Sequence, residues 1–447
     1  MQKQPAASIT PKKPPHSMSL WAAVSIGVGA MIGAGIFSIF GAAGAEAGNA
    51  LWIAFAAAGL VALLNTYSYA KLGSSFPSNG GPAEFLMQGF GDSIKTGGFN
   101  ILIWLGSIFS LALVSRGFGG YAASFLPGAP GGEWITYFAI GIIILFVVVN
   151  FWGAKAVGNS ELTIVSIKVG ILLLFGVAGI FFIKPALLSP SIWPAESNIL
   201  VAITLVFFSY LGFGYITNTA GDMANPKKTL PKALYLSVFI SIGIYLLVSI
   251  TVMGTLPFSE VLKAKDFALA EGAQPILGTL GFKLIAIAAL LSTSSAINAT
   301  MYGAANTSYM MARDGELPPA FDRKIWKNAE GGLFFTAAVT ILLAIAFPIE
   351  KIAMLGGVVY LLVYIAVNIA HLKIRTQTGA NKVVLFLSIL LNMSLIGIIF
   401  WYLFNTNTAI LFAFIGLILF CFIFEWGYRK TTGRRIKSTI NTTNSST

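Results

Sequence analysis

Charged residues are scarce in this chain of 447 residues, where they make up 10 % of the sequence while hydrophobic residues make up 56 %. Soluble domains carry about 25 % charged residues, so too few are present here to cover a water-facing surface of this size. The shortage excludes an ordinary soluble enzyme, a nucleic-acid-binding factor and a disordered protein. The sequence predicts an integral membrane protein, with the lipid bilayer as a partner and nucleic acid not a partner.

Cysteine and histidine are almost absent. The chain has one cysteine, Cys421, and two histidines, His16 and His371. A single cysteine forms no intramolecular disulfide, and protein metal sites are built mainly from clustered cysteine, histidine and carboxylate ligands. The sequence therefore predicts neither a metal site nor a bound cofactor.

Long apolar runs, in contrast, are abundant. A transmembrane helix needs about 20 apolar residues to cross a hydrocarbon layer of about 30 Å. Twelve runs approach or exceed this length, at residues 19–44, 50–73, 98–125, 134–152, 160–183, 197–220, 232–257, 275–311, 331–348, 350–371, 383–404 and 408–428. The predicted fold class is an all-α integral membrane protein with twelve transmembrane helices.

Basic residues are distributed unevenly between the loops. Lys and Arg are enriched on the cytoplasmic side of membrane proteins. With the N-terminus inside, 21 of the 28 basic residues are cytoplasmic, five are external, and Arg116 and Lys168 remain within spans. The sequence predicts a multi-pass protein of a prokaryotic cytoplasmic membrane with both termini in the cytoplasm. The basic segment 429–447 is interpreted as a disordered cytoplasmic tail.

Glycine-rich segments interrupt the first and sixth spans. They are residues 25–37, with Gly27, Gly29, Gly33 and Gly35, and residues 207–215, with Gly212 and Gly214. Interrupted helices at matching positions of two halves are typical of transporters with inverted repeats. The freed N–H and carbonyl groups of such breaks suit a ligand that carries both charges, such as an amino acid. The alternative is that the glycines only allow close helix packing.

Carboxylates are missing from the middle of every predicted span. Glu46 and Glu161 lie close to span ends, and we expect the others in loops or tails. Lys168 lies about 12 Å into the fifth span by helical rise. It either extends toward the cytoplasmic interface or carries a proton, since burial favours the neutral amine. Arg116 is more readily explained by packing or by reaching the external headgroups than by substrate binding.

Four segments resemble the amino acid–polyamine–organocation (APC) transporter family. They are Gly-Ala-Met-Ile-Gly-Ala-Gly-Ile-Phe at 29–37, Phe-Pro-Ser-Asn-Gly-Gly-Pro at 76–82, the stretch 208–231, and Arg-Asp-Gly-Glu-Leu-Pro at 313–318. The details are most similar to the sodium-independent, proton-coupled members of the family.

The resemblance implies a LeuT-type fold of five helices, an inverted five and two peripheral helices. The implied units are a tail at 1–18, repeat 1 at 19–183, repeat 2 at 197–374, the last two spans at 382–428 and the tail at 429–447.

The resemblance also implies the positions of the substrate site. Its residues are Ile32, Gly33, Ala34 and Gly35 for the substrate carboxylate, and Phe208, Ser209, Leu211 and Gly212 for the amine side, with Phe208 as an aromatic gate. Many relatives carry a glutamate where this chain has Gly214, so a mechanism that depends on an acidic gate is in doubt here.

The proton-coupling site follows from the same resemblance. The segment 164–168, which ends at Lys168, is similar to the fifth helix of proton-coupled relatives, where a lysine occupies the place that sodium fills in others. We expect protonated Lys168 to reach the Gly29 carbonyl and the hydroxyls of Thr293 and Ser294. The coupling ion would then be a proton, and no sodium is expected.

These observations predict a secondary transporter of small or neutral amino acids rather than an enzyme. No carboxylate lies in the predicted pocket to pair with a cationic side chain. A monomer would suffice for transport, although an oligomer is compatible with the sequence. The alternatives are an obligate amino acid exchanger with a structural lysine and, more remotely, an amino acid sensor on the same scaffold.

Overall fold

The computed structural model describes residues 18–127, 132–151, 161–313, 316–326 and 329–436. Its α-helices are α1 (Leu20–Ala34), α2 (Ile36–Ala47), α3 (Leu51–Ser75), α4 (Gly81–Phe90), α5 (Ile94–Ala123), α6 (Gly132–Phe151), α7 (Glu161–Ile180), α8 (Glu196–Phe207), α9 (Pro226–Thr255), α10 (Phe258–Lys263), α11 (Ala268–Arg313), α12 (Gly331–Ala346), α13 (Ile349–Lys373), α14 (Arg375–Thr378), α15 (Lys382–Thr406) and α16 (Thr408–Thr432). The 3₁₀ helices are η1 (Gly48–Ala50), η3 (Pro185–Leu188), η4 (Pro190–Ile192), η5 (Phe208–Asp222) and η6 (Lys265–Phe267).

The predicted all-α membrane fold is confirmed. Ten helical segments are long and apolar enough to cross a bilayer, and two shorter apolar helices, Leu20–Gly33 and Gly331–Ala346, accompany them within the described residues. Twelve spans in total stay a prediction. Two short antiparallel strands, β1 (Lys324–Trp326) and β2 (Ala329–Glu330), form a hairpin before α12 that the sequence did not predict.

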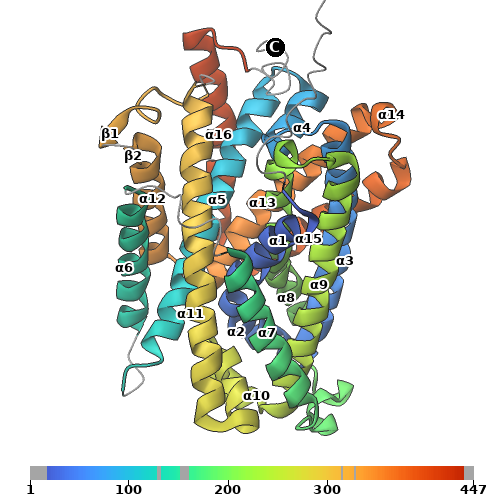
Figure 1. Ribbon diagram of the computed structural model, residues 1–447, viewed down its shortest axis with the longest axis vertical. Coiled ribbons are helices and arrows are strands. Elements are labelled where there is room, and N and C mark those ends of the chain that lie inside the picture. Colours follow the sequence, from blue (N-terminus) through green and yellow to red (C-terminus); the bar gives the residue numbers. More distant parts are fainter. Residues whose placement is uncertain (1–17, 128–131, 152–160, 314–315, 327–328, 437–447) are drawn as a thin grey trace, which may run out of the picture.

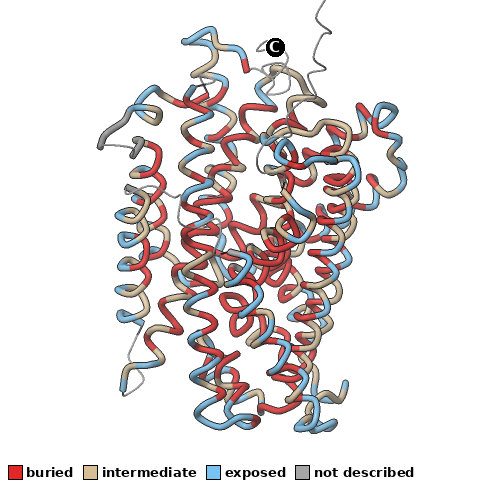
Figure 2. Tube along the Cα trace, in the orientation of Figure 1, coloured by how far each residue is buried: buried red, intermediate tan, exposed pale blue. Residues whose placement is uncertain are grey.

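Buried residues gather in the middle of the molecule, and exposed residues are more frequent toward its sides and ends (Figures 1 and 2). Of the 18 most apolar consecutive residues in each helix, 83 % are buried in α5 and 78 % in α13. The buried share is only 17 % in α6 and 22 % in α16. The outer helices expose large apolar side chains, including Leu145, Phe412 and Phe420. An exposed apolar surface of this kind belongs in contact with lipid.

Helix α11 runs almost the full length of the molecule (Figure 1). It begins at Ala268, before the predicted start at residue 275, and a non-helical Gly278 with φ of 61° separates its first turns from the rest. This backbone region favours glycine because a Cβ atom is strained there. The opposite end extends to Arg313, which agrees with the long eighth run of the sequence.

Candidate functional site

The first predicted span is divided at Gly35. Helix α1 ends at Ala34 and α2 begins at Ile36, while Gly35 adopts φ −86° and ψ −90° between them. Its φ is negative, so close packing rather than conformational freedom requires glycine here. A Cβ at this position would lie 2.6 Å from the Tyr245 hydroxyl and 2.7 Å from the Ser209 Cβ. The C-terminus of α1 and the N-terminus of α2 therefore meet at Gly35, whose N–H donates to the Met31 carbonyl at 2.8 Å and whose carbonyl accepts from the Ile39 N–H at 2.9 Å. In general, the first N–H groups and the last carbonyl groups of a helix have no partner within that helix.

The sixth predicted span changes helix type at its middle. Helix α8 ends at Phe207, and the chain continues as the 3₁₀ helix η5 for 15 residues. Most 3₁₀ segments are limited to three or four residues because their hydrogen-bond geometry is poorer. Gly212 allows η5 to pack directly on α1, since a Cβ there would lie 2.5 Å from the Met31 amide nitrogen. The two interrupted segments thus touch through their backbones.

The predicted substrate-site residues come together around this contact. Ile32 and Phe208 are buried, as are Ser209 and Leu211. The Ala34 side chain lies outside the described part of the structure. Ser209 accepts a hydrogen bond on its carbonyl from the Tyr245 hydroxyl at 3.0 Å. Its own hydroxyl is buried and has no hydrogen-bond partner among the described residues. This hydroxyl is therefore available to bind a polar ligand beside the break.

Lys168 extends from α7 into the space beside the first break. It is 2 % exposed, and its Nζ donates a hydrogen bond to the Gly29 carbonyl of α1 at 2.8 Å. A Cβ at Gly33 would lie 3.5 Å from the same Nζ, so the ammonium group also lies next to the glycines of the break. The interpretation in which the lysine extends to the membrane interface is wrong, because the amine instead binds α1.

Helix α11 forms the other wall of the lysine site. A Cβ at Gly33 would lie 3.0 Å from the Ser292 carbonyl oxygen, which places this turn of α11 against α1. Thr293 donates its hydroxyl to the Ala289 carbonyl of its own helix at 2.7 Å, and Ser294 is half-buried. The Ser292 hydroxyl is buried without a partner among the described residues. Contact of Lys168 with Thr293 and Ser294 stays a prediction.

Phe208, the first residue of η5, packs against α13. Its ring lies 6.3 Å from the Tyr360 ring in an edge-to-face arrangement. Gly356 provides the space, since a Cβ there would lie 2.8 Å from the Phe208 ring. The Tyr360 hydroxyl lies 3.4 Å from the hydroxyl of Tyr215 in η5. This tyrosine pair adds polar groups that the sequence did not predict, because its members lie far apart in the chain.

A sequence model described as "Amino acid permease" matches residues 18–444. The chain belongs to this family.

Three relatives show how widely this permease resembles others. An uncharacterized protein of Methanocaldococcus jannaschii is 42 % identical over 95 % of this chain and 98 % of its own length. The inner membrane transport protein YbaT of Escherichia coli is 32 % identical over 91 % of this chain and 95 % of its own. The branched-chain amino acid permease BcaP of Bacillus subtilis is 26 % identical over 79 % of each.

Arg116 of the permease joins three helices. Its guanidinium donates to the Ala344 carbonyl of α12 at 2.8 Å and to the Thr136 hydroxyl of α6 at 3.3 Å. These bonds favour the packing interpretation over a role in substrate binding.

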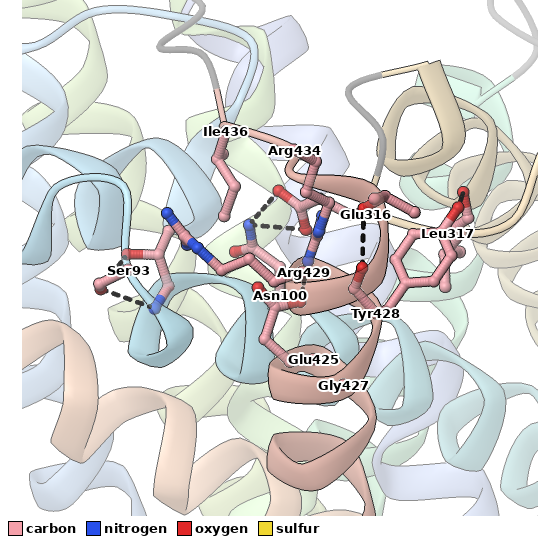
Figure 3. Close-up of polar contacts among 12 residues, drawn as sticks. Ser93, Asn100, Glu316, Leu317, Glu425, Gly427, Tyr428, Arg429, Arg434 and Ile436 are labelled. Atoms are coloured by element: carbon pink, nitrogen blue, oxygen red, sulfur yellow. Dashed lines mark hydrogen bonds and ion pairs between the residues drawn. The ribbon is translucent and has the colours of Figure 1, made fainter.

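A second polar region lies where α16 leaves the helical body (Figure 3). Glu425 is fully buried and forms an ion pair with Arg434. Gly433 ends α16 with φ of 64°, in the left-handed conformation that favours glycine, and lets Arg434 fold back. We call this group, completed by Asp92, Arg429, Asn100 and Glu316, the terminal cluster.

The terminal cluster joins three segments distant in sequence. Arg429 contacts the Asp92 carboxylate at 2.7 Å, and the Ile436 N–H donates to the same carboxylate at 3.1 Å. The Asn100 amide of α5 contacts both carboxylate oxygens of Glu316, at 3.1 and 3.2 Å (Figure 3).

Two expectations about charged residues are therefore wrong. Glu425 lies within α16, and Glu84 is buried within α4, rather than in a loop or tail. The helix continues through Arg429 to Thr432, and Ile436 is buried, so residues 429–436 are folded against the body.

The predicted tail at 1–18 lies almost entirely outside the described residues, as does 437–447. No group of three potential metal-ligating side chains occurs in the described ranges.

Proposed function

We propose that this permease is a proton-coupled, sodium-independent symporter of small or neutral amino acids. The observation that carries the proposal is the buried Lys168, whose amine binds the Gly29 carbonyl beside the broken first helix. A lysine amine can exist with or without its proton, unlike an arginine guanidinium, so this residue is the candidate for a group that binds and releases the coupling proton. An intramembrane ionisable residue at a helix break is a common feature of ion-coupled transport.

The substrate would bind where α1, α2 and η5 meet. The N-terminus of α2 attracts a carboxylate through its free N–H groups and helix dipole. Carbonyl groups freed at the break, together with the unused Ser209 hydroxyl, would receive the ammonium group. The predicted site residues include no acidic side chain to bind a cationic substrate. The name of the B. subtilis relative, a branched-chain amino acid permease, agrees with a neutral substrate.

The lysine would couple the proton to a change between two arrangements. Protonated Lys168 donates to Gly29 and holds α1 against α7, whereas the neutral amine binds the carbonyl less strongly. Loss of the proton would therefore release α1 and bias the equilibrium toward the other arrangement. The expected setting is twelve spans in two inverted repeats in a cytoplasmic membrane, with both termini in the cytoplasm. We propose transport rather than catalysis as its activity.

Uptake of labelled alanine into proteoliposomes tests this proposal. An inward proton gradient is compared with an inward sodium gradient for the native protein, Lys168→Ala, and the control Lys283→Ala, an exposed lysine of α11. We expect proton-driven uptake that falls at least tenfold in Lys168→Ala and is unchanged in Lys283→Ala.

Other outcomes would contradict the proposal in different ways. Sodium-driven uptake would refute proton coupling. Uptake that requires only preloaded amino acid, in both the native protein and Lys168→Ala, would make the protein an exchanger with a structural lysine. Full proton dependence in Lys168→Ala would assign coupling to another group.

A further inference from the structure

A cavity of about 580 Å³ lies outside the proposed transport site, between the ends of α3 and α9 and the short helix α14. Figure 1 shows α14 beside these ends, at the same end of the molecule as the C-terminus. The residues that matter for its chemistry are Tyr67, Lys71 and Ser75 of α3, Lys227 and Tyr235 of α9, and Gln377 of α14. The volume is ample for a phosphate-bearing headgroup.

The cavity is positively charged. Lys71 and Lys227 line it from opposite helices, and none of the described residues that line it is acidic. Two like charges facing one space repel each other, and an anion placed between them relieves this repulsion. The hydroxyl of Tyr67 accepts a hydrogen bond from the Asn381 N–H at 2.8 Å, so its own hydrogen is available for donation. Lysine, hydroxyl and amide donors together suit a phosphate group.

Apolar side chains continue from the cavity along the outside of the helices. The Tyr235 ring stacks on Phe239 with ring centroids 6.5 Å apart, and Phe239 is 57 % exposed. Val383, in the first turn of α15, is 55 % exposed. A small soluble anion would make no contact with this apolar surface, whereas the acyl chains of a lipid would cover it.

We propose that this cavity binds the headgroup of an anionic phospholipid, with the phosphate between Lys71 and Lys227 and the acyl chains against Phe239. The proposal requires only that the helices lie in a bilayer, so it does not depend on the transported substrate or the coupling ion. Basic pockets between transmembrane helices are suited to anionic headgroups. Because its walls belong to α3, α9 and α14, a bound lipid also holds these three helices together.

Native mass spectrometry of the purified full chain tests the proposal. Phosphatidylglycerol and phosphatidylcholine of the same acyl length are added in equal amounts, and bound lipid is counted for each. Variants are Lys71→Gln, Lys227→Gln and the double variant, with Lys228→Gln as the control because this exposed neighbour does not line the cavity. One lysine near an anionic headgroup contributes about fivefold in affinity, so we expect the preference of the double variant for phosphatidylglycerol to fall about 25-fold.

The proposal fails if the double variant retains the native preference or if Lys228→Gln lowers it equally. A further arm adds inorganic phosphate to lipid-free protein. If phosphate binds with millimolar or better affinity in a Lys71-dependent manner and displaces the lipid, the ligand is a soluble phosphate and the lipid assignment is overturned. Melting temperatures in phosphatidylcholine alone verify that each variant is folded. Alanine uptake is not a readout, so failure here leaves the proposed transport function intact.

Discussion

The break between α1 and α2 and the terminal cluster both place charge inside the protein, but they hold it differently. At the break, Lys168 binds a neutral backbone carbonyl. In the terminal cluster, Arg434 and Arg429 bind the carboxylates of Glu425 and Asp92. A guanidinium keeps its proton at any relevant pH, whereas a buried lysine can lose one. The cluster is therefore suited to permanent attachment, whereas the proposed mechanism assigns the break a change of state.

Glu425→Ala should cause the largest loss of stability. It tests whether the terminal cluster fastens α16 without taking part in transport. It removes the carboxylate that compensates Arg434, whose side chain is 5 % exposed. Breaking a buried ion pair by removing one partner costs about 3–5 kcal/mol. We expect a lower melting temperature in detergent, while the KM for alanine in the surviving protein stays within about twofold.

Two variants control this experiment. Glu425→Ala combined with Arg434→Ala should be less destabilising than Glu425→Ala alone, because no unpaired guanidinium remains buried. Glu260→Ala removes an exposed carboxylate that pairs with Lys263 and should change stability by less than about 1 kcal/mol. Equal losses for Glu425→Ala and Glu260→Ala would show that the terminal cluster does not fasten α16.

Gly212→Ala should have an intermediate effect on stability and a large effect on transport. The new Cβ would meet the backbone of α1 at Met31, which cannot rotate away. Overpacking of this kind costs about 1–3 kcal/mol and would separate η5 from the broken helix. We expect alanine uptake to fall at least tenfold.

Gly243→Ala is the matched control for this substitution. It lies in α9, and a Cβ there meets no atom within 4 Å, so stability should be unchanged or slightly improved. If Gly212→Ala transports as well as Gly243→Ala, the contact between α1 and η5 is not part of the transport site.

The same contrast explains how much the sequence could predict. The break in the first span can be predicted from the local sequence, because several glycines fall within one apolar run. Lys168 can be recognised in the same way, because it is a cation inside another apolar run. The terminal cluster leaves no such local signal. Its members at positions 92, 316 and 425 are ordinary charged residues near predicted span ends, and only the folded chain brings them together. The fold and the break were accessible through composition and spacing, but contacts between distant charged residues were not.

Asp92→Asn should cause the smallest loss of stability, and the salt dependence of that loss shows whether it is electrostatic. Asp92 and Arg429 are each 24 % exposed, so solvent screens their attraction and the loss should be about 1 kcal/mol. Asparagine keeps an oxygen that can accept the Ile436 N–H, so only the charge is removed. The difference from the native protein should shrink between about 0.1 and 1 M salt, because the Debye length falls from about 10 to 3 Å. Asp322→Asn, in the loop after α11, should cause no comparable loss.

The loss of stability in Glu425→Ala should persist at high salt, since ions do not reach a buried pair. If this loss disappears at high salt, both pairs act as surface charges.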